Sequence, residues 1–312
     1  MHKELRGIYI FVYVRDMSVS CKFYRDILGL RVIEEDEACV KFDAGEVILA
    51  LNRAADHGMA LANRPDDTSI NVFHTYGVEA LRAALEKRGL EFSGPTQSMD
   101  IGQAAAFYDP DGHCYSLYQP SDMAMKWPSA QKIRTVLHSQ PVGVRGNEKI
   151  RNADQERAPG EGLSETKLIY LFLFISDVDK SRKFYAETLG LPILEEAPYA
   201  GVVKYDAGGL ILATHLIDSE EGVRAKRDDL LRPKSIACVF YVKNARECYQ
   251  TLADKDLRFS AHPKESIIGV TVPFQDPDGH MFYLYEPSEK AMSWPSGKTI
   301  NQFLETPATA TA

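Results

Sequence analysis

The chain has few cysteines, few tryptophans and no C-x-x-C pair. Its 312 residues include five cysteines and two tryptophans. An odd number of scattered cysteines favours a reducing compartment over a secreted disulfide framework. We therefore expect a cytoplasmic protein whose cysteines act as small buried side chains. They are Cys21, Cys39, Cys114, Cys238 and Cys248.

Long apolar runs and clusters of basic residues are also missing. The longest apolar runs, Ile8–Val14 and Leu168–Ile175, are far shorter than the roughly 20 residues needed to cross a bilayer. The polar start, Met1–Arg6, does not have the pattern of a signal peptide. The 36 basic and 44 acidic residues are dispersed and give a net charge of −8. We expect no membrane and no nucleic-acid partner. The expected partner is therefore a small-molecule ligand. We expect the chain to be a monomer or a homodimer.

Three motifs occur twice in the same order. Asp16–Tyr24 returns as Asp177–Tyr185, and each copy continues to an Asp-Pro-Asp-Gly-His turn and a Trp-Pro-Ser tail. A period this long indicates duplicated domains, and 34.9 kDa suffices for two cores. The sequence predicts a first domain over residues 5–139 and a second over residues 165–306, each including its tail. Residues 140–164, rich in Gly, Pro and Asn, are predicted to form a linker.

The secondary-structure pattern is also duplicated. Ile8–Val14 and Ile169–Ile175 alternate aliphatic with aromatic residues, which predicts strands with apolar groups on both faces. Asp16 and Asp177 follow as helix N-caps. Leu28-Gly29 and its later equivalent Leu189-Gly190 mark the helix ends. Each half reads as two βαβββ modules, which predicts an α+β fold.

An Asp-capped helix with Phe-Tyr and Leu-Gly, followed by a module ending in Asp-Pro-Asp-Gly, resembles the vicinal oxygen chelate superfamily. That superfamily includes glyoxalases, bleomycin resistance proteins and extradiol dioxygenases. The chain resembles a tandem two-domain member. The resemblance implies that each domain pairs its two modules into a U-shaped mixed sheet around a cleft. A divalent metal usually lies at the centre of that cleft.

The resemblance also implies where metal ligands would lie, on the first and fourth strands of each module. None of these positions carries His, Asp or Glu, whereas a hard-metal site needs about three such donors. We therefore expect no metal cofactor. Divalent Fe, Mn, Ni or Zn enters only if other residues, such as His215, bind it. The positions are Tyr9, Ala50, Asn71, Ser116, Tyr170, Ala213, Ala237 and Tyr283.

The cleft-facing strand positions are rich in aromatic side chains with polar tips. Such walls suit a flat, largely apolar ligand held by stacking and a few hydrogen bonds. An alternative is that these rings simply fill the clefts. The candidate ligand-binding residues are Tyr9, Phe11, Tyr13, Asn52, Ser116, Tyr118, Tyr170, Phe172, Phe174, His215, Tyr283 and Tyr285.

Several other residues have both a functional and a structural interpretation. His215 could transfer a proton in a cleft with Tyr170, Tyr283 and Tyr285, or be a hydrogen-bonded rim residue. His113 and its repeat follow a turn glycine, so we expect both to be solvated structural residues. The tryptophan of each tail is either a lid or, as we prefer, an anchor that docks the tail.

The leading hypothesis is a metal-independent binder of a small aromatic or apolar molecule. The alternative is an enzyme, either extradiol-dioxygenase-like or a glyoxalase-like lyase or isomerase. It would use atypical metal ligands or acid–base chemistry, with His215, Tyr170 and Tyr283 as catalytic candidates. In a third interpretation the first half is a purely structural partner, and an isolated second half binds the ligand.

Overall fold

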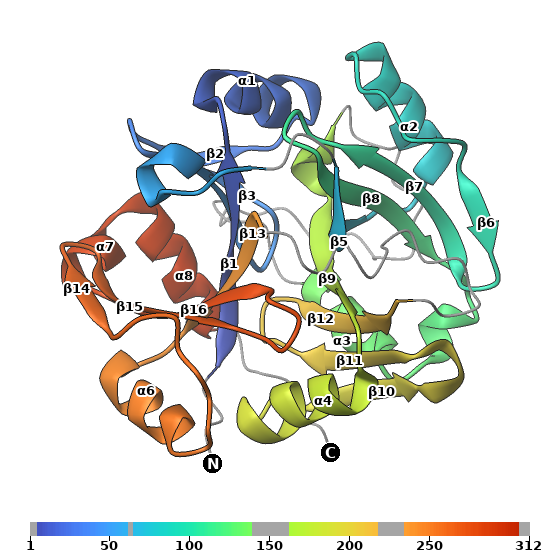
Figure 1. Cartoon of the computed structure of the whole chain (residues 1–312). Helices are drawn as coiled ribbons and strands as arrows, with labels where there is room; N and C mark the ends of the chain where they lie inside the picture. Colours follow the sequence, from blue (N-terminus) through green and yellow to red (C-terminus); the bar gives the residue numbers. More distant parts are fainter. Residues whose placement is uncertain (1–4, 62–64, 139–161, 218–233, 306–312) are drawn as a thin grey trace.

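The computed structural model describes residues 5–61, 65–138, 162–217 and 234–305 (Figure 1). They form an α+β fold with two eight-stranded mixed sheets. Residues 140–161 of the expected linker, and the expected domain ends at 139 and 306, lie outside the described residues. Within the described part, no helix is long and apolar enough to span a membrane. None of the five cysteines, all of which lie in the described part of the chain, forms a disulfide bond, and only Cys39 is not buried.

Each half contains the two predicted βαβββ modules. The strands of the first half are β1 (Arg6–Val14), β2 (Val32–Glu35), β3 (Cys39–Asp43), β4 (Ile48–Arg53), β5 (Asp66–His74), β6 (Gln97–Met99), β7 (Gly102–Tyr108) and β8 (His113–Pro120). Those of the second half are β9 (Lys167–Ile175), β10 (Ile193–Ala197), β11 (Val202–Asp206), β12 (Ile211–Leu216), β13 (Ile236–Tyr241), β14 (Lys264–Ser266), β15 (Gly269–Gln275) and β16 (Met281–Pro287).

The first helix of each half begins and ends where the sequence predicts. Asp16 caps α1 (Met17–Cys21) by accepting hydrogen bonds from the amides of Ser18 and Val19. A π-helical turn over Lys22–Ile27 continues α1. Gly29 then takes a φ of 71°, a left-handed conformation that glycine adopts without strain. Asp177 caps α4 (Val178–Arg182) in the same way, through the amide of Lys180.

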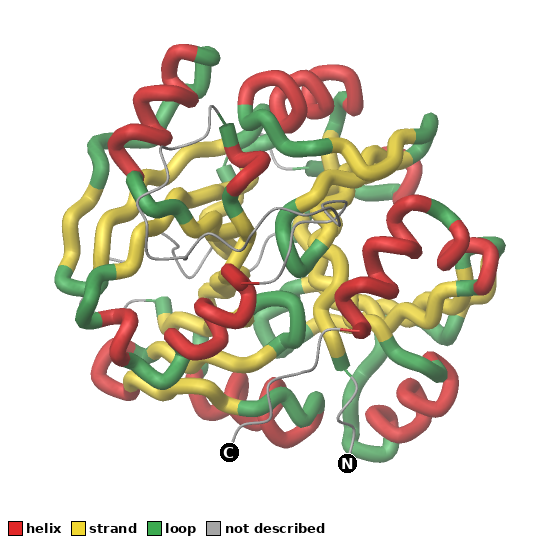
Figure 2. The backbone as a smooth tube through the Cα atoms, turned by 180° about the vertical axis from the view of Figure 1, so that it is seen from behind, coloured by secondary structure: helices red, strands yellow, loops and turns green. Residues whose placement is uncertain are grey.

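The remaining helices cover module surfaces or form the tails. They are α2 (Val78–Lys87), α3 (Ala130–His138), α6 (Ala245–Ala253), α7 (Glu289–Ser293) and α8 (Pro295–Glu305). The tail helices α3 and α8 were not predicted from the sequence. Helix α3 directly follows the first Trp-Pro-Ser motif, and α8 begins at the proline of the second. Figure 2 shows the helices arranged around the two sheets.

Each sheet draws one module from each half, which corrects the expected pairing within a half. Sheet A has the order β14-β15-β16-β13-β1-β4-β3-β2, and sheet B the order β10-β11-β12-β9-β5-β8-β7-β6. The junction in sheet A is an antiparallel pair of β1 with β13, and in sheet B of β5 with β9. The first strands of all modules have similar edges, so the repeat pattern fits either pairing.

The two modules of one half instead meet through side chains. The ring of Tyr24, from the turn after α1, lies 5.9 Å from the ring of Tyr115 on β8, in edge-to-face geometry. Phe73 on β5 stacks on the same Tyr115 ring at 6.3 Å. All three side chains are fully buried. This aromatic contact holds the turn after α1, which belongs to the first module, against β8 of sheet B.

Candidate functional site

Each sheet carries one face lined by aromatic side chains. In sheet A, Phe11 lies between Ala50 of β4 and Ala237 of β13 in the strand register. Because side chains alternate along a strand, this side also carries Tyr9, Tyr13, Asn52, Tyr283 and Tyr285, and we call it face A. The equivalent side of sheet B, face B, carries Ser116, Tyr118, Tyr170, Phe172, Phe174 and His215.

The predicted site residues are therefore grouped differently from the expectation. His215 shares face B with Tyr170 but lies in a different sheet from Tyr283 and Tyr285, so the expected cluster of these four is wrong. The cause is the pairing across halves, which moves β16 into sheet A. The ligand position predicted at Asn71 is off by one residue. Its neighbour Val72 is the residue that pairs with Ser116 on β8 and with Tyr170 on β9.

The metal positions of the resembled family do not fit a metal in this chain. In face A, Tyr9 lies across from Val239, which in turn lies across from Tyr283. Ala50 and Ala213 are fully buried among apolar side chains. Among the described residues, no group of three or more His, Cys, Asp or Glu could hold a metal ion. The donor set is thus unsuitable, and the absence of a cofactor stays a prediction.

The tail helices cover one end of each aromatic face. Ile300 and Phe303 of α8 pack against Tyr9, Ala50 and Tyr285 on face A. On face B, Ile133 and Val136 of α3 pack against Tyr170 and Ala213 in the same way. Burial raises the pKa of Tyr170, so this phenol stays protonated near neutral pH. On both faces, the tail helices therefore pack against residues at the positions where the resemblance implies metal ligands.

A Lys–Glu pair anchors the first tail to the opposite half. Lys204 on β11 donates to Glu195 on β10 at 2.8 Å and lies 4.8 Å from the centre of the Trp127 ring. Ser129 donates to the same Glu195 carboxylate at 2.7 Å. Burial opposes ionisation of Glu195, but the bonds from Lys204 and Ser129 outweigh it and lower the carboxyl pKa. This geometry fits the anchor interpretation of the tryptophan.

The second tail is anchored by the equivalent residues of the first half. Lys41 donates to Glu34 at 2.5 Å and to Ser296 at 3.1 Å. The Lys41 ammonium lies 5.6 Å from the centre of the Trp294 ring. The amide of Ser296 donates to Glu34 at 3.0 Å. Each half thus supplies a tail for the other half to hold, an exchange that the motif repeat alone did not reveal.

The middle of face A stays partly exposed between α8 and the segment after β4. Phe11 and Tyr283 are both half-buried, and their ring centres lie 5.9 Å apart. Three flexible apolar side chains border them, namely Met59, Leu61 and Met281. Aromatic and methionine side chains together form an adaptable apolar surface. Phe11 and Tyr283 therefore form a partly exposed part of face A.

Polar groups lie at the far end of the same surface. The hydroxyl oxygens of Tyr13 and Tyr283 are 3.1 Å apart. Burial raises the pKa of Tyr13, and the neighbouring Tyr283 raises it further, so the Tyr13 hydroxyl stays protonated near neutral pH and does not act as a base. Asn52, next to Tyr13 in the register, donates from its amide nitrogen to the carbonyl of Ala50 at 3.1 Å.

Face B has different polar groups at the matching positions. Phe174 replaces Tyr13, His215 replaces Asn52, and Ser116 replaces Tyr283. The His215 ring is half-buried and lies 5.7 Å from the ring of Phe174. Ser116 donates to the carbonyl of Leu117 at 3.0 Å. The two faces therefore differ in their polar groups at these positions.

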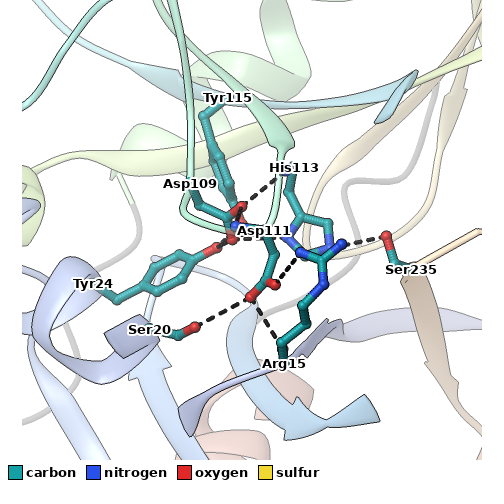
Figure 3. Close-up of polar contacts among 8 residues, drawn as sticks. All are labelled: Arg15, Ser20, Tyr24, Asp109, Asp111, His113, Tyr115 and Ser235. Carbon is teal, nitrogen blue, oxygen red and sulfur yellow. Dashed lines mark hydrogen bonds and ion pairs between the residues drawn. The ribbon is translucent and has the colours of Figure 1, made fainter. Parts of the chain in front are cut away.

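The duplicated histidines are buried, so the expectation that they are solvated is wrong. His113 is 1% exposed; its Nδ1 lies 2.7 Å from Asp109, and its Nε2 lies 2.9 Å from the hydroxyl of Ser235 (Figure 3). The Tyr24 hydroxyl donates to Asp109 at 2.6 Å. Burial disfavours the Asp109 carboxylate, but the charge of His113 and these hydrogen bonds outweigh it and lower its pKa. The other half covers this turn because Ser235 directly precedes β13 of sheet A.

A second contact ties the same turn to sheet A. Arg15, which directly follows β1, donates from its guanidinium to Asp111 at 2.8 Å and from its main-chain amide at 3.2 Å (Figure 3). Ser20 of α1 lies 3.4 Å from the same carboxylate. The turn between β7 and β8 therefore contacts both the strand and the helix of the first module.

Ser235, His113 and Asp109 lie in the order and at the distances of a Ser–His–Asp triad. The second copy shows what the shared part does. His280 contacts Asp276 at 2.9 Å, yet its Nε2 faces the main-chain carbonyl of Thr68 at 3.2 Å, and a carbonyl only accepts. The second copy thus keeps the Asp–His pair although it has no serine hydroxyl beside the histidine. We therefore infer that the role of both turns is to join the two sheets.

Comparison with known proteins agrees with this fold. The model of the Glyoxalase/Bleomycin resistance protein/Dioxygenase superfamily matches residues 8–115 and 167–284. The chain belongs to this superfamily. No curated protein matches the chain. Two copies of the family pattern thus account for most of both halves.

Solved structures with low sequence identity share the superfamily fold across both halves. Glyoxalase I from Zea mays has a TM-score of 0.59 at 14% identity, covering 98% of this chain and 97% of that chain. A candidate dioxygenase from Bacillus subtilis subsp. subtilis str. 168 has a TM-score of 0.60 at 15% identity, covering 95% and 90%. The cppA protein from Streptococcus pneumoniae TIGR4 reaches 0.50 at 11% identity, covering 91% and 100%. At such identities these likenesses establish the fold alone.

Proposed function

We propose that the protein binds a small aromatic or apolar molecule on the exposed part of face A, without the metal typical of its superfamily. One observation carries this proposal. Phe11 and Tyr283 form a partly exposed aromatic surface between α8 and Met59, beside polar tyrosine and asparagine groups. A largely apolar surface with a few oriented polar groups is the usual composition of a small-molecule site.

The packing of α8 on Ala50, one of the positions where the resemblance implies a metal ligand, supports the metal-free part of the proposal. A metal there would need donors where Ala50 is packed under Phe303 and Ile300 of α8. The groups that remain on face A bind by stacking and hydrogen bonding. The ligand would therefore contact the ring of Phe11 and the side chains beside it.

Calorimetric titration of the full chain with neutral bicyclic aromatics tests the proposal. Phe11→Ala is expected to weaken binding at least tenfold, while the equivalent face B change, Phe172→Ala, leaves it intact. The reverse result would place the site on face B. Native mass spectrometry of freshly purified protein would also report bound metal, and stoichiometric Fe, Mn, Ni or Zn would contradict the metal-free proposal.

The alternative, an enzyme using acid–base chemistry, depends on face B. Tyr170 lies beneath α3 with a raised pKa, which leaves His215 as the group suited to proton transfer there. A turnover that depends on pH and is lost in His215→Phe would support the alternative. Unchanged turnover in that variant would remove the role of His215.

A further inference from the structure

The polar end of face A has an unequal supply of donors and acceptors. Tyr13 and Tyr283 carry two hydroxyl protons, and their mutual hydrogen bond uses one of them. Within the described residues, neither phenol makes another side-chain hydrogen bond. The pair therefore keeps one donor for a ligand. A ligand atom placed here must accept a hydrogen bond.

Asn52 supplies the matching acceptor. Its amide nitrogen is used by the carbonyl of Ala50, while its side-chain oxygen has no hydrogen-bond partner among the described residues. Tyr13 and Asn52 are direct neighbours on parallel strands, which lie about 4.8 Å apart. A single ligand atom that both accepts and donates can satisfy both residues, and a hydroxyl group is such an atom.

In the described part of the chain, the side chains that pack against Phe11, Tyr13 and Tyr283 are apolar, aromatic or neutral polar groups. The Lys41 ammonium is paired with Glu34 and bonded to Ser296 beside α8. His57, whose ring lies 5.0 Å from that of Tyr13, has a pKa lowered by burial and stays neutral at pH 7. A partly buried carboxylate or phenolate would lose hydration without compensation.

We infer that face A binds a neutral aromatic molecule through a ring hydroxyl, held between the Tyr13–Tyr283 pair and Asn52 while the ring packs on Phe11. This inference rests on the proposed function and specifies its ligand class. Face B would not share the preference, because Phe174 and Ser116 replace the two phenols there.

Fluorescence titration of the full chain with three naphthalenes tests the inference. 2-Naphthol both donates and accepts, 2-methoxynaphthalene only accepts, and 2-naphthoate carries a charge. At pH 7 we expect 2-naphthol to bind about tenfold more tightly than either of the others, which corresponds to one net hydrogen bond. Thermal unfolding of every variant would confirm that it is folded.

Variants distinguish the inference about the ring hydroxyl from the more general proposed function. Asn52→Leu is expected to remove most of the preference for 2-naphthol while 2-methoxynaphthalene binds as before, because only the naphthol hydroxyl donates to the Asn52 side-chain oxygen. The double variant Tyr13→Phe with Tyr283→Phe removes both phenol donors and is expected to weaken binding of both neutral compounds. The control is Tyr249→Phe, which removes a phenol bonded to His262 on the surface and should change nothing. Equal binding of all three compounds, or tightest binding of 2-naphthoate, would overturn the inference and leave the proposed function standing. No binding of any compound would count against both.

Discussion

The hydroxyl oxygens of Tyr13 and Tyr283 lie 3.1 Å apart, although 270 positions separate the two residues in the sequence. Tyr13 belongs to the first strand of the chain and Tyr283 to the last. They meet because sheet A joins β1 to β13, with β16 next to it. The candidate binding surface is therefore built from both repeats, and neither repeat contains it alone.

This hydroxyl contact should be measurable as a coupling. Tyr13→Phe and Tyr283→Phe are each expected to lower the free energy of unfolding by about 1 kcal/mol, and the double variant by little more than one of them. Urea unfolding of the four proteins gives the coupling energy. Additive losses from the two single changes would show that the hydroxyls do not interact in solution.

The buried tail anchor should be sensitive to losing one charge. The side chains of Lys204 and Glu195 are 9% and 11% exposed. Lys204→Met strands the Glu195 carboxylate under the tail, so we expect a loss of about 3 kcal/mol in the free energy of unfolding. Chemical denaturation checks this, and Lys204→Met with Glu195→Met should recover most of the loss.

A surface ion pair provides the control for the tail anchor. Arg246 and Glu265 are 57% and 73% exposed, so Arg246→Met should change stability by no more than about 0.5 kcal/mol. If Lys204→Met were as mild as Arg246→Met, the anchor would contribute nothing to holding the tail.

Stability should depend on pH through the buried Asp276–His280 pair. The pKa of Asp276 is held below 3.8, so its contribution is present above pH 3.8 and is lost as the pH falls through the folded value. Burial alone would lower the pKa of His280, but Asp276 raises it above 6.5. That contribution is present below pH 6.5 and is lost as the pH rises through the folded value.

Asp276→Asn should remove this dependence. The difference in unfolding free energy between wild type and Asp276→Asn is expected to be largest, at about 3 kcal/mol, between pH 3.8 and pH 6.5. Urea unfolding at intervals from pH 3 to pH 9 would measure it. A difference that stays constant over this range would show that the pair does not titrate in this way.

The two halves should need each other to fold. The second half alone would lack β1 and β5, which pair with β13 and β9 in the centre of the two sheets. Expressed as separate chains in one cell, the halves are expected to co-purify as a one-to-one complex. A monomeric second half with native circular dichroism and ligand binding would contradict this and restore the interpretation of the first half as a mere partner.

Local features were predictable because they depend on neighbouring residues. The capping of α1 by Asp16, the left-handed Gly29 and the period-two pattern of β1 each follow from a few consecutive side chains. The chemical difference between the faces was also readable, because Asn52 and His215 occupy equivalent positions of the repeat.

Long-range pairing was not predictable from the repeat. Duplicated modules have similar edges, so the sequence fits sheets within a half as well as sheets across halves. The unpredicted pairing across halves also explains why His113 was wrongly expected to be solvated. A turn of this type usually faces solvent, whereas here Tyr24 of the same half and Ser235 of the other half both contact it. Helix α8 escaped notice because its motif was treated as a tail.

The junction of β1 with β13 also bears on how the chain is made. The ribosome synthesises β1 long before its antiparallel partner β13, so sheet A can be completed only after most of both repeats has been made. Sheet B can close over a shorter separation, because β5 and β9 are closer in sequence. Until β13 is made, β1 presents an unpaired apolar edge, which makes the nascent protein a candidate client for chaperones.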